Sequence, residues 1–413
     1  MGILFKIIMQ FIKNEATCFW SILLMFILYG CVEPYEGTVK DFDDVLVVNA
    51  IITNEYKRQE VLLTRSYRFE DNGPTAEKNA TVIVLDGEGG TFNFEETEPG
   101  KYLSVNPFAV EIGMNYSLSI TTVNGNSYAS NTMQLPVSST TIGDLYAERI
   151  TNNDGIEGMG IFVDSFDPLG KSFYYRHEYE ETYIIIAPFW TPFDLVVVSE
   201  GFLIFGMRVI LREREEKLCY GTDLSNTIIL HSTKELTEDR LSRYNVRFID
   251  RDNYILSYRY SILVKQYVQT PEAFSYYETL KGLSQSSENI FSEDQPGFLA
   301  GNIFSLNDSK ENVAGFFEIA TVTEKRIFFN YEDFFPGEEL PPFLKECDLI
   351  APSLEGTVGS RSLLNAIFYE GMVSFYDYNR NPGPNEGPYL MVRSECGDCT
   401  TLGSNRSPDF WIE

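Results

Sequence analysis

Histidine and positive charge are scarce in this sequence of 413 residues. It has two histidines, His177 and His231, and 32 lysines and arginines against 60 aspartates and glutamates, for a formal net charge of −28. So few histidines supply little acid–base catalysis, and the deficit of positive charge argues against binding to nucleic acid phosphates. Neither a Gly-x-Ser-x-Gly motif nor a Walker loop is present. We therefore expect a protein that is not an enzyme, needs no cofactor and binds no nucleic acid.

A long membrane-spanning apolar run is also lacking. The apolar stretch from Phe19 to Gly30 is shorter than the roughly 20 residues that a span needs. It follows Lys6 and Lys13 and ends directly before Cys31, which is typical of a secretory signal. A cysteine after a small residue is what bacterial lipoprotein processing requires, so we expect a signal peptide over residues 1–30 and lipidation of Cys31 by acyl chains such as palmitate. The alternative is an ordinary signal peptide or an uncleaved anchor.

The residues after Cys31 are polar and acidic. The stretch "VEPYEGTVKDFDD" (32–44) has no hydrophobic periodicity, so residues 31–44 are expected to form a flexible tether. Glu33 and Glu36 resemble the surface-export signals of some Gram-negative lipoproteins. We therefore expect an outer-membrane lipoprotein that faces the cell exterior.

Cysteine is rare, and its placement is informative. Of the six cysteines, Cys18 leaves with the signal and Cys31 is lipidated, which leaves Cys219, Cys347, Cys396 and Cys399. A zinc site at Cys396-Gly-Asp-Cys399 would need further ligands, and a redox motif would need a βαβ setting. Structural disulfides are the favoured interpretation in an oxidising compartment. Three pairings are possible, and we expect Cys347 to join one of the C-terminal pair.

Short strands dominate the chain from residue 45. Hairpin turns are predicted at Asp86–Gly90 and at Asn124-Gly125. Tyr116, Leu118 and Ile120 alternate with polar residues, which is typical of a strand with one buried face. The fold class is therefore mainly β, and residues 45–138 are expected to form an immunoglobulin-like or transthyretin-like β-sandwich.

A larger β-rich domain is expected over residues 139–413. Thr270-Pro271-Glu272 favours the start of one inserted helix over about 271–284. Residues 331–413 are rich in Pro, Gly and Asn, which predicts an irregular tail. Because this tail holds three of the four remaining cysteines, we expect disulfides to staple it.

One apolar segment, residues 183–211, contains the stretch "APFWTPF". The simpler interpretation is core strands around tight turns. The sharper one is a projecting loop whose Phe189, Trp190 and Phe193 bind a partner, because Pro188 and Pro192 cannot donate to a sheet.

Several motifs occur together in order along the chain. They are Cys31-Val32-Glu33-Pro34, "LVVNAIITNE", "NATVIVLDGEGG", "GMNYSLSITTVNGNSYAS", "SYRYSILVKQYVQTPEAFSYYETLK", "VAGFFEIATVTEKRIFF" and a terminal Cys-x-x-Cys before "RSPDFW". Their order resembles the Bacteroidota lipoproteins classed as domain of unknown function 4249. The resemblance supplies no catalytic residues. It implies an outer-membrane accessory of a TonB-dependent transporter barrel that captures or gates the substrate. The alternative is a free-standing surface adhesin that binds polysaccharide or protein.

Overall fold

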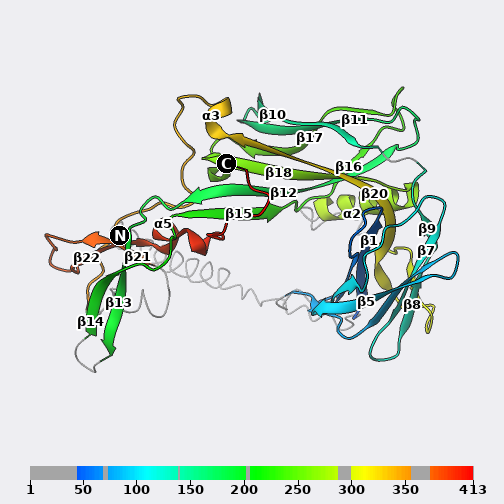
Figure 1. Ribbon diagram of the computed structural model, residues 1–413, viewed down its shortest axis with the longest axis horizontal. Helices are drawn as coiled ribbons and strands as arrows, with labels where there is room; N and C mark the ends of the chain where they lie inside the picture. The colour runs from blue at the N-terminus through cyan, green and yellow to red at the C-terminus, as the bar shows by residue number, and fades with distance from the viewer. Residues whose placement is uncertain are drawn as a thin grey trace, which may run out of the picture. The chain divides into compact units, whose positions relative to one another are not determined.

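β-strands are the main regular structure of the described residues, which confirms the mainly β class predicted from the sequence (Figure 1). The computed structural model describes residues 44–67, 73–137, 140–200, 205–286, 299–354 and 373–412. The signal segment, Cys31 and the tether up to residue 43 lie outside these residues. Within the described ranges, no helix is both long and apolar enough to cross a membrane.

The N-terminal region contains nine strands within its described residues. They are β1 (Leu46–Thr53), β2 (Glu60–Arg65), β3 (Thr75–Ala76), β4 (Thr81–Asp86), β5 (Thr91–Glu98), β6 (Lys101–Ser104), β7 (Asn115–Thr121), β8 (Ser127–Ser130) and β9 (Met133–Gln134). Both predicted hairpins are present, since β4 pairs with β5 and β7 with β8. Gly125 in the second turn has a φ of 86°, a conformation that glycine adopts readily.

The following region is built from longer strands. β10 (Ile142–Thr151), β11 (Glu157–Phe166) and β17 (Arg240–Asp250) form a separate three-stranded sheet. β12 (Tyr174–Ile186) pairs with β18 (Arg259–Val268) on one side, and with β15 (Leu218–Leu224) and β16 (Ile229–Ser232) on the other. The short 3-10 helix η1 (Tyr254–Leu256) precedes β18.

Strand β20 (Val313–Asn330) joins the two regions into one sheet. Its first half pairs in parallel with β1, from Leu46↔Val313 to Thr53↔Ala320. Its second half pairs antiparallel with β18, from Val268↔Thr321 to Arg259↔Asn330. In the described part of the chain the result is one continuous 15-stranded sheet. Strands β1–β9 therefore do not form a sheet of their own.

The predicted helix is present as α2 (Pro271–Ser286), and the Thr270 hydroxyl accepts a bond from the Ala273 N–H at 3.3 Å. Beyond it, β19 (Ile303–Ser305) pairs with β8, and α3 (Tyr331–Phe334) follows β20 directly. The segment from residue 331, expected to be irregular, contains the hairpin β21 (Val373–Tyr378) and β22 (Tyr389–Arg393), followed by α5 (Ser394–Gly397) and η2 (Cys399–Thr401). A second hairpin, β13 (Phe193–Glu200) with β14 (Phe205–Leu211), lies beside it (Figure 1).

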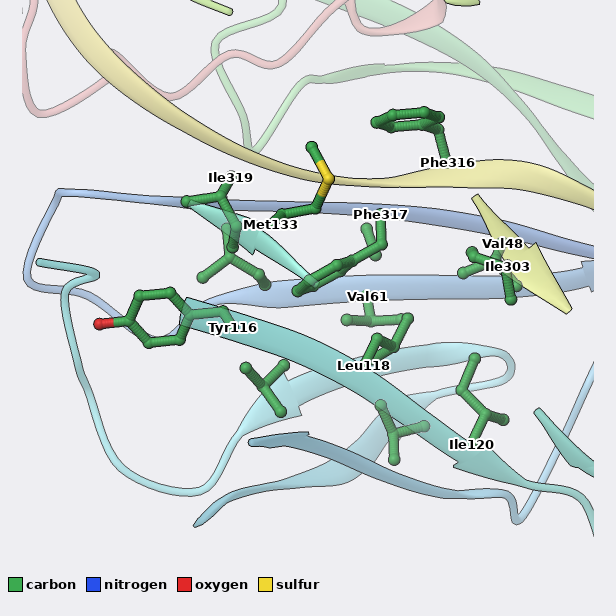
Figure 2. Packing of buried hydrophobic residues seen from close by; sticks show 14 of the residues in the cluster. Val48, Val61, Tyr116, Leu118, Ile120, Met133, Ile303, Phe316, Phe317 and Ile319 are labelled. Carbon is green, nitrogen blue, oxygen red and sulfur yellow. The ribbon is translucent and has the colours of Figure 1, made fainter. Parts of the chain in front are cut away.

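The first hydrophobic core lies between the N-terminal strands and β20. Tyr116, Leu118 and Ile120 of β7 are buried, as their alternation predicted. They lie across from Val48 and Val61, with Phe317 and Ile319 of β20 among them (Figure 2). Gly315 permits the close approach of β20 to β1, because a Cβ at residue 315 would meet the Val48 carbonyl oxygen at 1.8 Å.

A second core fills the space between the three-stranded sheet and the strands β12, β15 and β18. A buried polar network crosses it. The guanidinium of Arg247 binds both Glu181 oxygens, at 3.1 and 2.9 Å, and the Tyr260 hydroxyl donates to the same carboxylate at 2.6 Å. Arg247 and Glu181 therefore compensate each other's charge, as buried charges require.

A buried ion pair lies where the two regions meet. Glu318 of β20 is fully buried, and its Oε2 is 3.5 Å from Arg176 Nη2 of β12. Gln269 Nε2 donates to its other oxygen at 2.7 Å. The Arg176 guanidinium also lies over the rings of Tyr267 and Tyr277, at 4.3 and 4.8 Å. Burial raises the pKa of Glu318, and Arg176 opposes that rise.

We expect Arg176→Met to destabilise the protein by about 3–5 kcal/mol, because it leaves Glu318 charged, buried and uncompensated. Without Arg176 the folded-state pKa of Glu318 rises further above its unfolded value. The loss should therefore be greatest above the raised folded-state pKa, should fade as the pH falls from it toward the ordinary carboxyl pKa, and should be gone below that ordinary value. Urea unfolding at neutral pH and at a pH below the ordinary carboxyl pKa measures it.

Arg240→Met is the matched control, since its partner Glu238 is 61% exposed and such surface pairs contribute about 0–1 kcal/mol. An equal effect of the two substitutions at neutral pH would contradict the assignment. Adding Glu318→Gln to Arg176→Met should recover part of the stability.

Candidate functional site

A cleft of about 580 Å³ lies between the β13–β14 hairpin and strand β21. We call it the aromatic cleft. Its described lining consists of Trp190, Thr191, Pro192, Phe193, Val209, Leu211, Phe375, Tyr376, Asp377 and Tyr378. The size falls in the range of ligand-binding clefts, about 300–1,000 Å³.

The first wall is built from residues 190–193 and from one face of β14. Pro192 ends the link from β12, and Phe193 opens β13 with 42% of its surface exposed. Val209 and Leu211 share a strand face and line the cleft. Because side chains alternate along a strand, Arg208 belongs to the opposite face.

The second wall is four consecutive residues of β21, from Phe375 to Tyr378. A regular strand would turn alternate residues away. Here the register with β22 shifts between Phe375 and Asp377, and such a bulge redirects side chains. The bulge at Tyr376 therefore explains how neighbouring residues of one strand can face the same space.

A small apolar cluster holds the two walls together from behind. Leu195 of β13 packs with Phe375 and Met391, and Tyr389 lies against this cluster. Burial raises the pKa of Tyr389. The ring of Phe189 meets Tyr376 edge to face, with centroids 5.2 Å apart. The cleft thus has a packed base beneath a more exposed rim.

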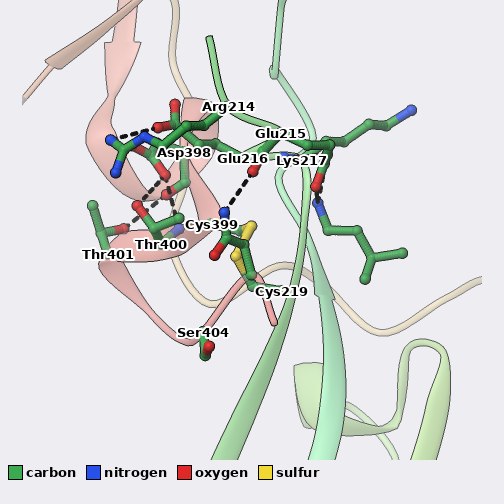
Figure 3. Close-up of a disulfide and its surroundings, with 12 residues drawn as sticks. Arg214, Glu215, Glu216, Lys217, Cys219, Asp398, Cys399, Thr400, Thr401 and Ser404 are labelled. Carbon is green, nitrogen blue, oxygen red and sulfur yellow. Dashed lines mark hydrogen bonds and ion pairs between the residues drawn. A yellow bond between two sulfur atoms is a disulfide. The ribbon is translucent and has the colours of Figure 1, made fainter. Parts of the chain in front are cut away.

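Two disulfides tie the tail to the rest of the chain. Cys219 of β15 bonds to Cys399, and Cys347 bonds to Cys396. The Cys399 N–H also donates to the Glu216 carbonyl oxygen at 2.9 Å, close to the first bridge (Figure 3). The Phe189 N–H donates to the Cys396 carbonyl oxygen at 2.9 Å. The bridges therefore tie the segment that follows β22 to β15 and to Cys347, and the Phe189–Cys396 bond holds it beside the start of the first wall.

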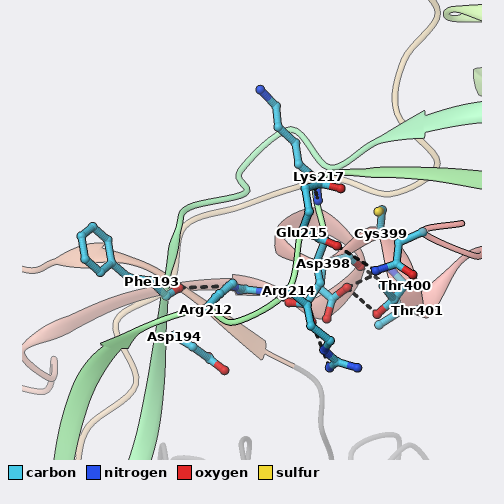
Figure 4. A network of polar contacts seen from close by, with 12 residues as sticks. Phe193, Asp194, Arg212, Arg214, Glu215, Lys217, Asp398, Cys399, Thr400 and Thr401 are labelled. Carbon is cyan, nitrogen blue, oxygen red and sulfur yellow. Dashed lines mark hydrogen bonds and ion pairs between the residues drawn. The ribbon is translucent and has the colours of Figure 1, made fainter.

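A polar pocket of about 270 Å³ lies next to the apolar cluster and includes Asp194, Arg212, Arg214, Glu216 and Asp398 in its lining. Arg212 Nε donates to the Phe193 carbonyl oxygen at 3.1 Å (Figure 4). Its guanidinium also pairs with Glu216, and both side chains are largely buried. Arg214 Nη2 lies 3.0 Å from the same carboxylate. Both arginines thus share the Glu216 carboxylate, and Arg212 also holds the backbone at Phe193.

The structure gathers the residues of the apolar segment at one place. Phe189 packs behind the second wall, Trp190 lines the cleft while packing on the second core, and Phe193 forms part of the rim. The sequence did not indicate Tyr376, Asp377 and Tyr378. Their short stretch "VSFYDY" alternates weakly and lies in a region rich in Pro and Gly, so only its three aromatic residues could have marked it.

The two histidines lie elsewhere, on β12 and β16, where the rings of both contact Tyr244. His177 is buried, and its Nε2 lies 3.2 Å from Gln266 Oε1. Burial lowers the pKa of His177 to about 4, so it is neutral at pH 7. Among the residues that the structure describes, no three His, Cys, Asp or Glu side chains gather into a metal site.

Fold and site together define a mainly β protein with a disulfide-held C-terminal segment and an aromatic surface cleft. The chain belongs to the family described as domain of unknown function (DUF4249), which its sequence matches over residues 32–326. A comparison with curated proteins found no match. The matched range includes the first wall of the cleft and ends before β21, which supplies the second.

We expect the two disulfides to differ in their reduction. Cys219, Cys396 and Cys399 are fully buried, whereas Cys347 is partly exposed. Because reduction requires access to a sulfur, a mild thiol reductant should open Cys347–Cys396 first and leave Cys219–Cys399 intact. Alkylation in native buffer followed by peptide mass spectrometry measures the order.

In denaturant the same treatment should label all four cysteines, which controls for their intrinsic reactivity. Equal labelling of Cys219 and Cys347 in native buffer would contradict the burial described here.

Proposed function

We propose that this protein is a lipid-anchored, non-enzymatic binding protein of the outer membrane that faces the cell exterior. In this role it is the accessory of a TonB-dependent transporter barrel and captures or gates the transporter's substrate. The aromatic cleft is the surface through which it binds its partner, and its exposed aromatic rim is the observation that supports the proposal.

Exposure of the rim supports a binding role. Leu211 is 67% exposed, Tyr378 51% and Phe193 42%. These apolar side chains lie around one cleft instead of being scattered, and such grouping marks interaction sites. Aromatic residues are also enriched at the centres of protein interfaces.

The chemistry of the cleft favours contact over catalysis. Rings and aliphatic side chains dominate its described lining, with Asp377 as the one carboxylate. Glycoside hydrolysis uses a pair of carboxylates, and nucleophilic catalysis uses a nucleophile beside a base. A rigid aromatic surface instead supplies large contact area at small entropic cost.

A mild-detergent pull-down of the tagged full-length protein from its native membrane tests the partner. We expect a β-barrel transporter in near-equal amount by mass spectrometry. The double substitution Phe193→Ser and Leu211→Ser removes two exposed rim contacts and should lower recovery of the barrel by at least about tenfold, since each anchor contributes on the order of 1 kcal/mol or more.

Leu169→Ser is the matched control, because Leu169 is 68% exposed in the turn after β11 and does not line the cleft. It should leave recovery unchanged. A lipoprotein that elutes without a barrel would favour the free-standing adhesin instead, and ligand screening with polysaccharides and host proteins would follow.

The lipid anchor has its own test. Cys31→Ser removes the thiol that the acyl chains require, so we expect the protein to leave the membrane pellet after cell fractionation and to lose the mass of the acyl chains. Cys18→Ser is the control, since residue 18 belongs to the predicted signal. A Cys31→Ser protein that still pellets with its acyl mass would overturn the anchor.

A further inference from the structure

We propose that the aromatic cleft binds a basic side chain, lysine or arginine, presented by an exposed segment of the partner protein. The cation lies over the faces of the aromatic rings, and the Asp377 carboxylate neutralises its charge. This inference rests on the proposed function, because it names the chemistry by which the accessory recognises its partner.

The first observation that supports a basic ligand is the charge within the cleft. Asp377 is the only residue with a formal charge among the described lining residues. Its side chain is exposed, and its Oδ1 accepts a local bond from the Tyr378 N–H, at 2.8 Å. Arg212 of the polar pocket is paired with Glu216 and largely buried. The negative charge of Asp377 therefore faces the cleft without a basic partner among the described lining residues.

The rings carry the second step. A cation over an aromatic face is attracted by the ring quadrupole, most strongly over tryptophan. Trp190, Phe193, Tyr376 and Tyr378 all line this one cleft. Neighbouring rings hold two of these rings in place. The Tyr378 and Phe375 ring centroids are 5.7 Å apart, and those of Tyr376 and Phe189 are 5.2 Å apart. The rings are thus oriented before any ligand arrives, which lowers the entropic cost of binding.

Elsewhere in the chain, arginines make cation–π contacts with the chain's own aromatic rings. Arg326 lies over Phe410 at 3.6 Å, and Arg176 lies over Tyr267 at 4.3 Å. No lysine or arginine of the described ranges stacks on any of the five rings that line the aromatic cleft. The cleft therefore combines rings and a carboxylate with no described cation in place.

Size and overall charge favour a protein segment over a small free cation. A cleft of about 580 Å³ is much larger than one ammonium group, and Leu211 and Phe193 extend it with apolar surface for the residues that flank the cation. The formal net charge of −28 attracts basic partners during encounter. Arginine is also among the residues that contribute most at interfaces.

Trp190 provides a direct readout. The chain has three tryptophans, Trp20, Trp190 and Trp411; Trp20 belongs to the predicted signal, and Trp411 contacts Tyr220 and Phe328 away from the cleft. Trp411→Phe keeps those ring contacts and leaves Trp190 as the mature protein's fluorescent reporter. The full-length protein in mild detergent is titrated with the peptide acetyl-Phe-Lys-Phe-amide, and with versions carrying arginine, norleucine or glutamate at the centre.

We expect the lysine and arginine peptides to change Trp190 fluorescence saturably and to bind about tenfold more tightly than the norleucine peptide, which has a similar length but no charge. Asp377→Asn should remove most of this preference while leaving the norleucine affinity unchanged. Asp252→Asn, at an exposed turn outside the cleft, should change neither. Equal affinity for the lysine, norleucine and glutamate peptides would overturn the inference, as would binding of tetramethylammonium alone as tightly as the lysine peptide.

A charge-reversing substitution at Asp377, together with the peptide titration, separates this inference from the proposed function. If wild type and Asp377→Lys recover the barrel equally in the pull-down, the accessory role stands and the basic-segment inference fails. If no barrel is recovered but the lysine preference and its loss in Asp377→Asn are observed, the inference stands and the transporter partner is wrong.

Discussion

Strand β20 is the constraint on which the rest of the structure depends. Its 18 residues need hydrogen-bonding partners along their full length, and two different regions supply them. β1 covers the first half in parallel and β18 covers the second half antiparallel. The first core is completed by Val313, Phe316, Phe317 and Ile319 of this strand. The N-terminal strands therefore cannot bury their apolar face until a segment from far along the chain has been added.

The junction on β20 also carries an electrostatic cost. Burying Glu318 and Arg176 removes two charges from water, and their attraction only offsets this loss when both are present and hydrogen-bonded. Gln269 and the rings of Tyr267 and Tyr277 complete that environment. Such a pair is a poor source of net stability. It does favour the observed alignment of β12 and β20, because another alignment would leave the buried Glu318 without Arg176.

Local patterns were sufficient to predict what local physics decides. The turn at Gly125, the alternation in β7 and the Thr270 cap of α2 depend on neighbours within a few residues, and the structure has all three. The parallel pairing of β1 with β20 has no such signal, because parallel strands share no tight turn. The pairing of the four cysteines likewise has no local signal in the sequence, which left three pairings open. The bulge at Tyr376 depends on the register with β22, which the sequence "VSFYDY" does not encode by itself.

The aromatic cleft follows from these long-range ties. Its two walls come from residues 190–211 and 375–378 and meet through a small apolar cluster. That cluster is too small to align the walls unaided, so the two disulfides and the Phe189–Cys396 backbone bond supply the remaining restraint. The family match includes the first wall and ends before the second. Asp377 and three of the five rings that line the cleft therefore belong to the part of the chain beyond the matched range. If the cleft selects its partner by charge, the selecting carboxylate lies in this C-terminal segment, and the matched region provides the apolar surface against which it acts.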